Sequence, residues 1–258
     1  MSKIIFKDVC LDIPLLVNNR LFSKNKNFSE KLVGAKKKND SHGKIMSSIL
    51  ENISFECNEG DSVGILGHNG SGKTTLLRVI SGIYQQTRGL VDIQGKISSL
   101  LNIDLTVKPD ATGYENIRIF WLYKNKCCDL KTLINQVENF SELGDFLNLP
   151  IKNYSSGMQA RLLFSLCTYI TSDILLVDEG IVSADESFIK KTKQHLETFI
   201  NTNKIKIYAS HDLKFIKDNC NKVFLLKKGK LSIFEDVDKG INYYLKEYDS
   251  NNNNDKFE

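Results

Sequence analysis

The chain has 258 residues, of which 41% are hydrophobic and 26% charged, and its formal net charge is +4. This composition is typical of a folded globular protein and allows one large domain or two small ones. No apolar run approaches the ~18 residues that a membrane-spanning helix needs. The charge is too small, and its two signs too mixed, to indicate a nucleic-acid-binding protein by itself.

The first ten residues, MSKIIFKDVC, do not have the pattern of a secretion signal. Lys7 and Asp8 stand where a signal peptide needs an apolar stretch. We therefore expect a cytosolic chain that reaches a membrane only through a membrane protein.

Cysteine usage favours a reducing compartment. The simplest interpretation is reduced thiols, with Cys57 and Cys167 as small core residues and a redox pair of Cys127 and Cys128 as the alternative. The six cysteines form no C-x-x-C pair and are Cys10, Cys57, Cys127, Cys128, Cys167 and Cys220.

The N-terminal region predicts a small sheet with an insertion. Residues 4–13 and 49–57 alternate in hydropathy and predict two strands. The basic, asparagine-rich stretch at about 18–46 predicts a solvated loop with one short helix at about 29–33. A docking site for a partner is the alternative for this loop.

The following residues alternate between strand and helix patterns. Residues 62–67 predict a buried strand, 73–80 a helix that stops at Gly82, and 90–101 a hairpin. Residues 113–149 are mostly helical in pattern and end at Pro150.

The C-terminal half contributes two more buried strands. The apolar runs of DILLVDE (173–179) and KIKIYASHD (204–212) are typical of a parallel sheet. Strands and helices interrupted by a helical insert, at about 105–165, predict an α/β nucleotide-binding fold. We expect one domain over 1–245 and a disordered, low-complexity tail over 246–258.

A glycine-rich loop between the strand and the helix predicts a phosphate site. It fits the pattern G-x-x-x-x-G-K-[ST], in which backbone N–H groups and the helix N-terminus face the phosphates. We expect Lys73 to reach the β- and γ-phosphates and the Thr74 hydroxyl to ligate Mg²⁺. The loop comprises Gly67, His68, Asn69, Gly70, Ser71, Gly72, Lys73, Thr74 and Thr75.

Carboxylates and a histidine follow two of the predicted buried strands. The carboxyl ends of such strands are where open α/β sheets bind ligands. We expect Asp178 to hold Mg²⁺ and Glu179 to deprotonate the attacking water. His211 is expected to hydrogen-bond the γ-phosphate or that water.

Four motifs in this order, GHNGSGKTT, YSSGM, ILLVDE and SHD, resemble the ATP-binding subunits of ABC transporters. The resemblance covers nearly the whole chain and implies a P-loop core with an antiparallel β subdomain and a helical subdomain. It implies two ATP molecules between two copies of the chain. In that dimer Ser155, Ser156 and Gly157 of one copy clamp the γ-phosphate bound by the other. Ser155 can also serve as an ordinary helix cap.

The YSSGM form of the second motif is similar to that of the polysaccharide-exporter branch of the family. The stretches PDATGYENI (109–117) and FSELGDFLNLP (140–150) are similar to the same branch. This branch implies export of a lipid-linked O-antigen or capsular glycan across the inner membrane. It also implies separate permease subunits in a two-plus-two assembly, with this chain on the cytoplasmic face. Some relatives carry an additional C-terminal glycan-binding domain, which we do not expect so soon after the last strand.

The sequence departs from the family pattern in the segment 100–113, which is glycine-rich in the family and faces the permease or the glycan headgroup. Its middle here is residues 104–107, DLTV, and Asn102 is the nearest replacement for the expected metal-proximal glutamine or acid. Ala184 replaces the usual glycine before Asp185, the residue that signals across the dimer in the family.

The aromatic residue that stacks on adenine has no clear equivalent. Phe22 and Phe28 are candidates only by their position near the N-terminal strands. The contact with the base stays open.

Several functions share these motifs. An exporter of teichoic acid would use a similar ATPase, and a soluble ABC ATPase acting on ribosomes or DNA is a second class. The latter usually has two cassettes or a long coiled coil, and neither is present in this sequence. A P-loop kinase or GTPase would not need YSSGM.

Overall fold

The computed structural model describes residues 1–14, 36–39, 45–99, 107–124, 128–168, 172–178 and 198–254. These residues belong to two compact units, which we describe separately. The first unit comprises residues 1–95 and 205–258, and the helical unit comprises residues 96–204.

The first unit contains an antiparallel sheet with the strand order β2-β3-β1-β5. In the β1–β3 pair Ile4 lies opposite Cys57, and both side chains are fully buried. The two strands that the sequence predicts here are therefore confirmed. The bounds are β1 Lys3–Pro14, β2 Lys36–Asn39, β3 Ile45–Asn58 and β5 Arg88–Gln94.

The basic insertion is only partly described. Residues 36–39, predicted to lie in a solvated loop, instead form β2, which pairs with β3 and so gains backbone hydrogen bonds. The predicted helix at 29–33 and the adenine candidates Phe22 and Phe28 lie outside the described residues.

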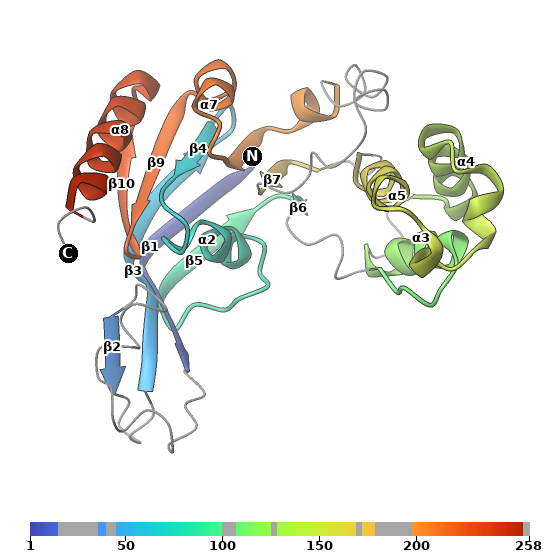
Figure 1. Ribbon diagram of the computed structural model, residues 1–258, viewed down its shortest axis with the longest axis horizontal. Helices are drawn as coiled ribbons and strands as arrows, with labels where there is room; N and C mark the ends of the chain where they lie inside the picture. Colours follow the sequence, from blue (N-terminus) through green and yellow to red (C-terminus); the bar gives the residue numbers. More distant parts are fainter. Residues whose placement is uncertain are drawn as a thin grey trace. The chain divides into compact units, whose positions relative to one another are not determined.

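The same unit contains a second group of strands around β4, whose residues are all buried. β4 pairs in parallel with β8 and with β9, and β10 pairs antiparallel with β9. Helix α8 lies beside β9 and β10 (Figure 1). The bounds are β4 Ser62–Leu66, α2 Lys73–Ile80, β8 Ile205–Ala209, α7 Leu213–Asn219, β9 Lys222–Lys227, β10 Lys230–Phe234 and α8 Val237–Asn254.

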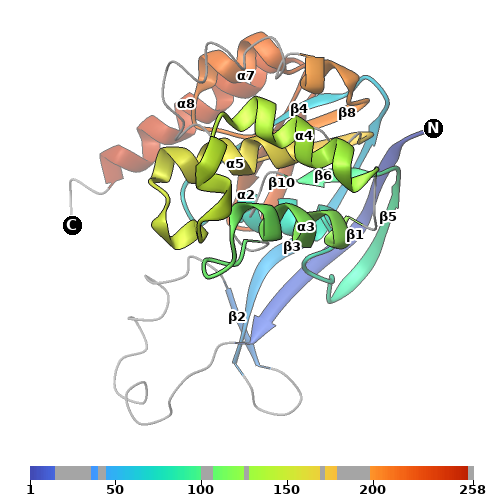
Figure 2. The same cartoon turned by 90° about the vertical axis from the view of Figure 1, so that its right-hand side faces the viewer.

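The helical unit gathers α3, α4 and α5 around one apolar core (Figures 1 and 2). A capping box of Thr112 and Glu115 begins α3, and the Asp129 side chain caps α4. The predicted helical stretch before Pro150 is confirmed. The bounds are β6 Ile97–Ser99, α3 Gly113–Tyr123, α4 Leu130–Ser141, the 3₁₀ helices Gly144–Asn148 and Ile151–Asn153, α5 Ser156–Thr168 and β7 Ile174–Val177.

Two further predictions differ from the structure. The hairpin predicted over 90–101 is wrong, because β5 pairs with β1 whereas β6 pairs in parallel with β7. The tail expected to be disordered from residue 246 is helical as far as Asn254, within α8. Among the described residues, no helix combines the length and the hydrophobicity that crossing a membrane requires.

Candidate nucleotide-binding site

The loop between β4 and α2 lies directly on β9. A Cβ atom added to Gly67 would lie 2.3 Å from the Leu226 carbonyl oxygen and 2.6 Å from Ser71 Oγ. One added to Gly72 would lie 3.3 Å from a Leu226 methyl group. Leu226 therefore forms the floor beneath two glycines of the loop. The sequence does not single out Leu226, because nothing in a strand pattern marks which residue the loop covers.

The loop and helix present backbone donors, as a phosphate site requires. Gly70 and Gly72 have φ angles of +78° and +106°, which side chains rarely adopt, and Gly72 is the N-cap of α2. No side chain caps α2 and no acidic residue lies in its first turn. The first-turn N–H groups can therefore bind an anion.

Lys73 is buried, with 8% of its surface exposed, and its ammonium lies within the loop. Nζ donates to the carbonyl oxygens of Gly67 at 2.7 Å and His68 at 3.4 Å, and lies 3.3 Å from His211 Nε2. The structure thus brings together two residues that the sequence places far apart. A phosphate entering the loop would offer this ammonium stronger, charged acceptors than carbonyl oxygens.

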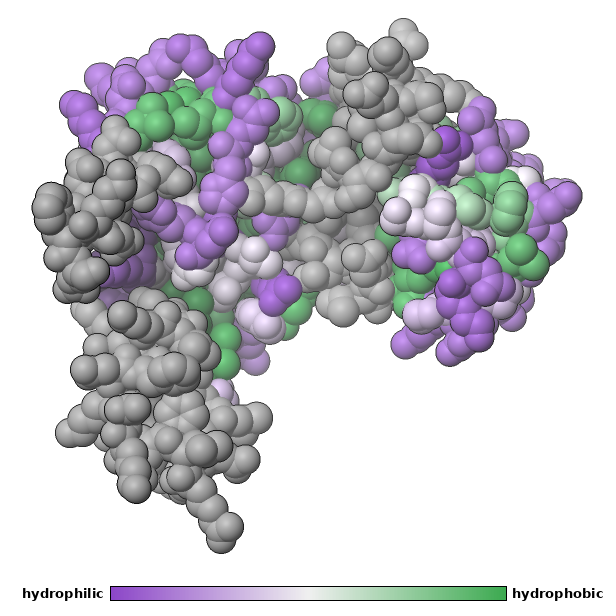
Figure 3. Space-filling model, in the orientation of Figure 1, coloured by the Kyte–Doolittle hydropathy of each residue, from purple (hydrophilic) through white to green (hydrophobic). Residues whose placement is uncertain are grey.

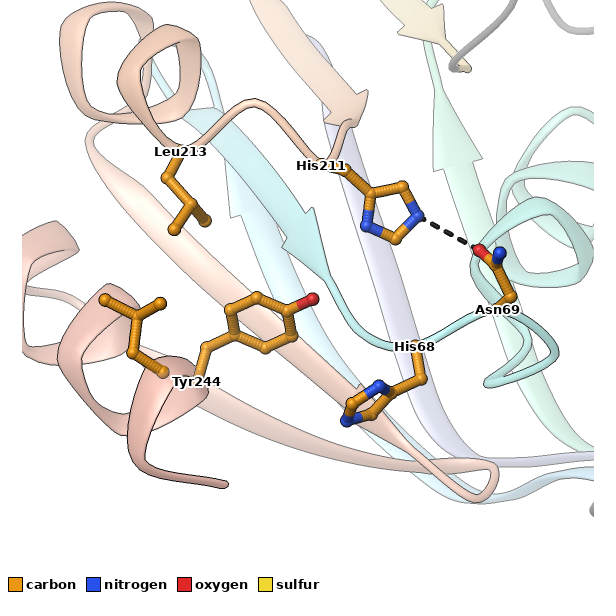
Figure 4. Close-up of a pocket in the computed structure, with 6 residues that line it drawn as sticks. His68, Asn69, His211, Leu213 and Tyr244 are labelled. Atoms are coloured by element: carbon orange, nitrogen blue, oxygen red, sulfur yellow. Dashed lines mark hydrogen bonds between the residues drawn. The ribbon is translucent and has the colours of Figure 1, made fainter. Parts of the chain in front are cut away.

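His211 has two contacts that compete for one nitrogen. Its Nε2 lies 3.3 Å from the Lys73 ammonium and 3.1 Å from Asn69 Oδ1 (Figure 4). An ammonium can only donate and an amide oxygen can only accept, so one tautomer of His211 cannot satisfy both. The exposed His211 side chain can therefore change partners when Lys73 turns to a phosphate.

A cavity of about 640 Å³ lies beside the loop, within the first unit. Figure 4 shows side chains from the loop, from the end of β8 and from α8 around it. Tyr244 belongs to α8, and the sequence gives no indication that it lies here. The lining residues are His68, Asn69, His211, Leu213, Tyr244 and Leu245.

The serine–glycine segment lies in the helical unit, at the start of α5. Ser155 Oγ accepts a hydrogen bond from the Met158 N–H at 3.2 Å, so Ser155 is a helix cap. The Ser155 and Ser156 side chains are both exposed. Among the described residues, a Cβ atom added to Gly157 would meet nothing closer than Ser155 Oγ at 3.9 Å. The packing of the described residues therefore does not explain why residue 157 is a glycine.

Asp178 follows β7 and is half-buried in the helical unit. Carboxylate and hydroxyl oxygens are ligands that Mg²⁺ prefers, so Asp178 and Thr74 fit this ion chemically. Within the described ranges there is no group of three or more His, Cys, Asp or Glu side chains that could hold a metal ion. The predicted site residues Asn102, Glu179 and Asp185 lie outside those ranges.

One further residue of the helical unit stands out by its hydrogen bonds. Asn116 is 2% exposed, and its Nδ2 lies 2.9–3.1 Å from the carbonyl oxygens of Lys108, Ala111 and Thr112. Its Oδ1 accepts from the Lys108 N–H at 2.7 Å. Asn116 therefore holds the turn before α3. The sequence analysis did not single out Asn116. Its position as a polar residue on an otherwise apolar helix face could have indicated a structural role.

The loop, the uncapped helix and the buried lysine together define a P-loop nucleotide-binding protein. The chain belongs to the ABC transporter family, whose model matches residues 50–182. It is therefore an ATPase of the ABC class, as the four motifs predict.

The most informative relatives are named for export of cell-surface polymers. The chain is 38% identical over 231 residues to the O-antigen export system ATP-binding protein RfbE of Yersinia enterocolitica, covering 89% of this chain and 96% of that protein. It is 33% identical to the teichoic acids export ATP-binding protein TagH of Staphylococcus haemolyticus, covering 91% and 89%. A Lactococcus lactis TagH is 36% identical over 86% of this chain, which spans only 47% of that protein.

Solved structures support the fold alone. A dimeric, post-hydrolysis ATP-binding cassette, MJ0796, bound to ADP and Pi has a TM-score of 0.64 at 19% identity, covering 90% of this chain and 97% of that one. A second dimeric structure of MJ0796 has a TM-score of 0.63. The predicted ABC ATPase fold is confirmed.

Proposed function

We propose that this chain is the ATP-hydrolysing motor subunit of an ABC exporter that moves a lipid-linked polysaccharide of O-antigen or capsule type across the inner membrane. The assignment of the cargo rests on the 38% identity to an O-antigen export protein over 96% of that protein's length. The P-loop geometry supports the ATP chemistry. Transport would need separate permease subunits, because the O-antigen relative is named as the ATP-binding protein of an export system.

The proposed nucleotide is ATP with Mg²⁺. The N–H groups of the loop and the Lys73 ammonium bind the β- and γ-phosphates, and His211 binds the γ-phosphate or the attacking water. Thr74 and Asp178 would hold Mg²⁺, which withdraws charge from the phosphates when it is bound. Glu179 takes the proton of the attacking water.

The proposed active form is a dimer in which the segment Ser155–Gly157 of each copy caps the γ-phosphate held by the other. Two observations support this use of the segment. The two serine side chains are exposed, and among the described residues no atom outside the adjacent helix backbone comes closer than 3.9 Å to a Cβ atom added to Gly157. A glycine with open space around it allows a phosphate to come close to the backbone. Asp185 would carry the signal between the copies.

The proposed permease contact is a groove of about 700 Å³ on the helical unit. It combines exposed charged groups with the apolar side chains of Ile119 and Leu122 on α3, and Leu122 is 52% exposed. On the face shown in Figure 3, hydrophobic and hydrophilic residues both reach the surface of this unit. Asn116 fixes the turn that forms one wall of the groove. Two permease subunits and two copies of this chain, at the cytoplasmic face, complete the proposed assembly.

A teichoic acid polymer is the second candidate cargo, because the TagH relatives cover most of this chain. A soluble ABC ATPase is the alternative outside transport. These three possibilities differ in what the chain binds in a cell.

The deciding experiment begins with affinity capture of the tagged chain from gently solubilised native membranes. Recovery of a stoichiometric multi-helix permease supports transport, whereas recovery of ribosomal or DNA-bound proteins alone contradicts it. The captured complex is then placed in proteoliposomes with either a lipid-linked O-antigen or a lipid-linked teichoic acid. ATP-dependent movement of the first polymer alone is the expected result, with the Glu179→Gln complex as the inactive control.

A further inference from the structure

The C-terminal helix α8 is fixed closely on the strand that supports the P-loop. A Cβ atom added to Gly240 would lie 2.8 Å from Val223 Cβ, so this glycine lets the helix touch β9. Further along the helix, Glu247 forms a 2.8 Å ion pair with Lys227 at the end of the same strand. Ile241 is 8% exposed and anchors the helix between these points. The position of α8 is therefore set by β9.

From this helix Tyr244 reaches the P-loop. Its side chain is 7% exposed, and its ring centroid lies 6.0 Å from that of His68, at an interplanar angle of 46°. Figure 4 shows the ring extending from α8 beside His68, with its hydroxyl on the side of His211. The adjacent Tyr243 is 46% exposed and its ring contacts Phe234 instead. Two neighbouring tyrosines thus have different surroundings.

His68 is the residue through which Tyr244 can act on the nucleotide site. The His68 carbonyl oxygen accepts from the Ser71 N–H at 3.1 Å and from Lys73 Nζ at 3.4 Å. The first bond closes the turn of the loop, and the second involves the ammonium that binds phosphate. Holding the His68 side chain therefore restricts the backbone that shapes the phosphate site.

We propose that Tyr244 is a positioning residue for ATP binding, which holds His68 and thereby the P-loop in the shape that receives the phosphates. This inference rests on the proposed function only in that the P-loop is the ATP site. It makes α8 part of the nucleotide site, so that whatever displaces the C-terminal helix lowers the affinity for ATP. Tyr244 itself touches no phosphate.

The test compares Tyr244→Leu with Tyr243→Leu in the full chain. The measurements are the dissociation constant for ATP, by calorimetry, and kcat and KM for hydrolysis. An aromatic pair contributes about 0.5–1.5 kcal/mol, which corresponds to roughly twofold to tenfold in affinity. We expect Tyr244→Leu to weaken ATP binding and raise KM by that factor while kcat at saturating ATP stays near that of the unchanged chain. Tyr243→Leu should bind ATP normally. Unchanged affinity in Tyr244→Leu overturns the proposal.

A double-mutant cycle separates positioning from a general loss of structure. His68→Ala should weaken ATP binding by a similar factor, and adding Tyr244→Leu should weaken it no further. If the two effects add, Tyr244 does not act through His68 and the proposal is wrong. The His68→Ala arm stays decisive even if Tyr244→Leu does not fold, because normal affinity in that variant also overturns the proposal. Lys73→Ala separates this outcome from failure of the proposed function. If the P-loop is not the ATP site, Lys73→Ala will leave ATP binding unaltered.

Discussion

The P-loop and the serine–glycine segment both contain glycines, but the packing of the described residues explains only the glycines of the P-loop. Gly67 lies against the Leu226 carbonyl and Ser71, where a Cβ atom has no room. Gly157 has no described neighbour closer than 3.9 Å to an added Cβ atom and lies in the first turn of α5, where alanine would be more stable. The fold of one chain explains the first glycine, and the proposed contact with a second copy would explain the second. This difference is the physical basis for the proposed dimer.

The largest effect is expected for Glu179→Gln. Removing the proposed general base should slow ATP hydrolysis by at least about a hundredfold, whereas ATP binding should persist because the P-loop is unchanged. Single-turnover hydrolysis and equilibrium nucleotide binding measure the two effects separately. Glu179→Asp, which keeps a carboxylate, is the matched control. Hydrolysis at nearly the normal rate in Glu179→Gln would remove Glu179 from this role.

Substituting alanine for Gly67 and for Gly157 in turn tests whether the two glycines are present for different reasons. Gly67→Ala places a Cβ atom 2.3 Å from a backbone oxygen, so the loop has to leave β9. Overpacking of this kind costs about 1–3 kcal/mol. We therefore expect Gly67→Ala to lower both the melting temperature and the affinity for ATP of the isolated chain.

Gly157→Ala should have the opposite pattern. Because no described residue comes closer than 3.9 Å to the added Cβ atom, the isolated chain should fold as before, gain up to about 1 kcal/mol of helix stability and bind ATP normally. Its ATP-dependent dimer, measured by light scattering with hydrolysis blocked, should weaken. A normal dimer in Gly157→Ala would mean that the close approach of a partner does not explain the glycine.

The sequence predicts the features that local residues determine, but not those that depend on distant partners. The loop and the helix over 73–80 were predictable because local pattern and phosphate chemistry determine them. The hairpin prediction over 90–101 failed because β5 and β6 take their partners from strands distant in the sequence. Likewise, no local feature distinguishes Tyr244 from Tyr243, and only the packing of α8 on β9 gives them different surroundings.

Ser155→Arg tests whether Ser155 faces the second copy of the chain. The Ser155 side chain is exposed, so the monomer should accept arginine and still bind ATP. In the dimer the same side chain would occupy the space facing the second copy's nucleotide, and ATP-driven association should be lost. Light scattering with and without ATP measures this. An unaltered dimer would contradict the clamp.

The smallest effect is expected for Ser155→Ala, which separates the two roles of this serine. Losing the hydroxyl removes the bond from the Met158 N–H, and an N-cap of this kind contributes about 1 kcal/mol of stability. Ser155→Asp is the matched control, because aspartate also caps a helix but brings a negative charge toward a phosphate. If Ser155 only caps α5, denaturant unfolding should show a loss in the alanine variant alone, and both variants should dimerise. If it also clamps ATP, the aspartate variant should keep the stability of the monomer and still fail to dimerise. That separation of stability from association is the result we expect.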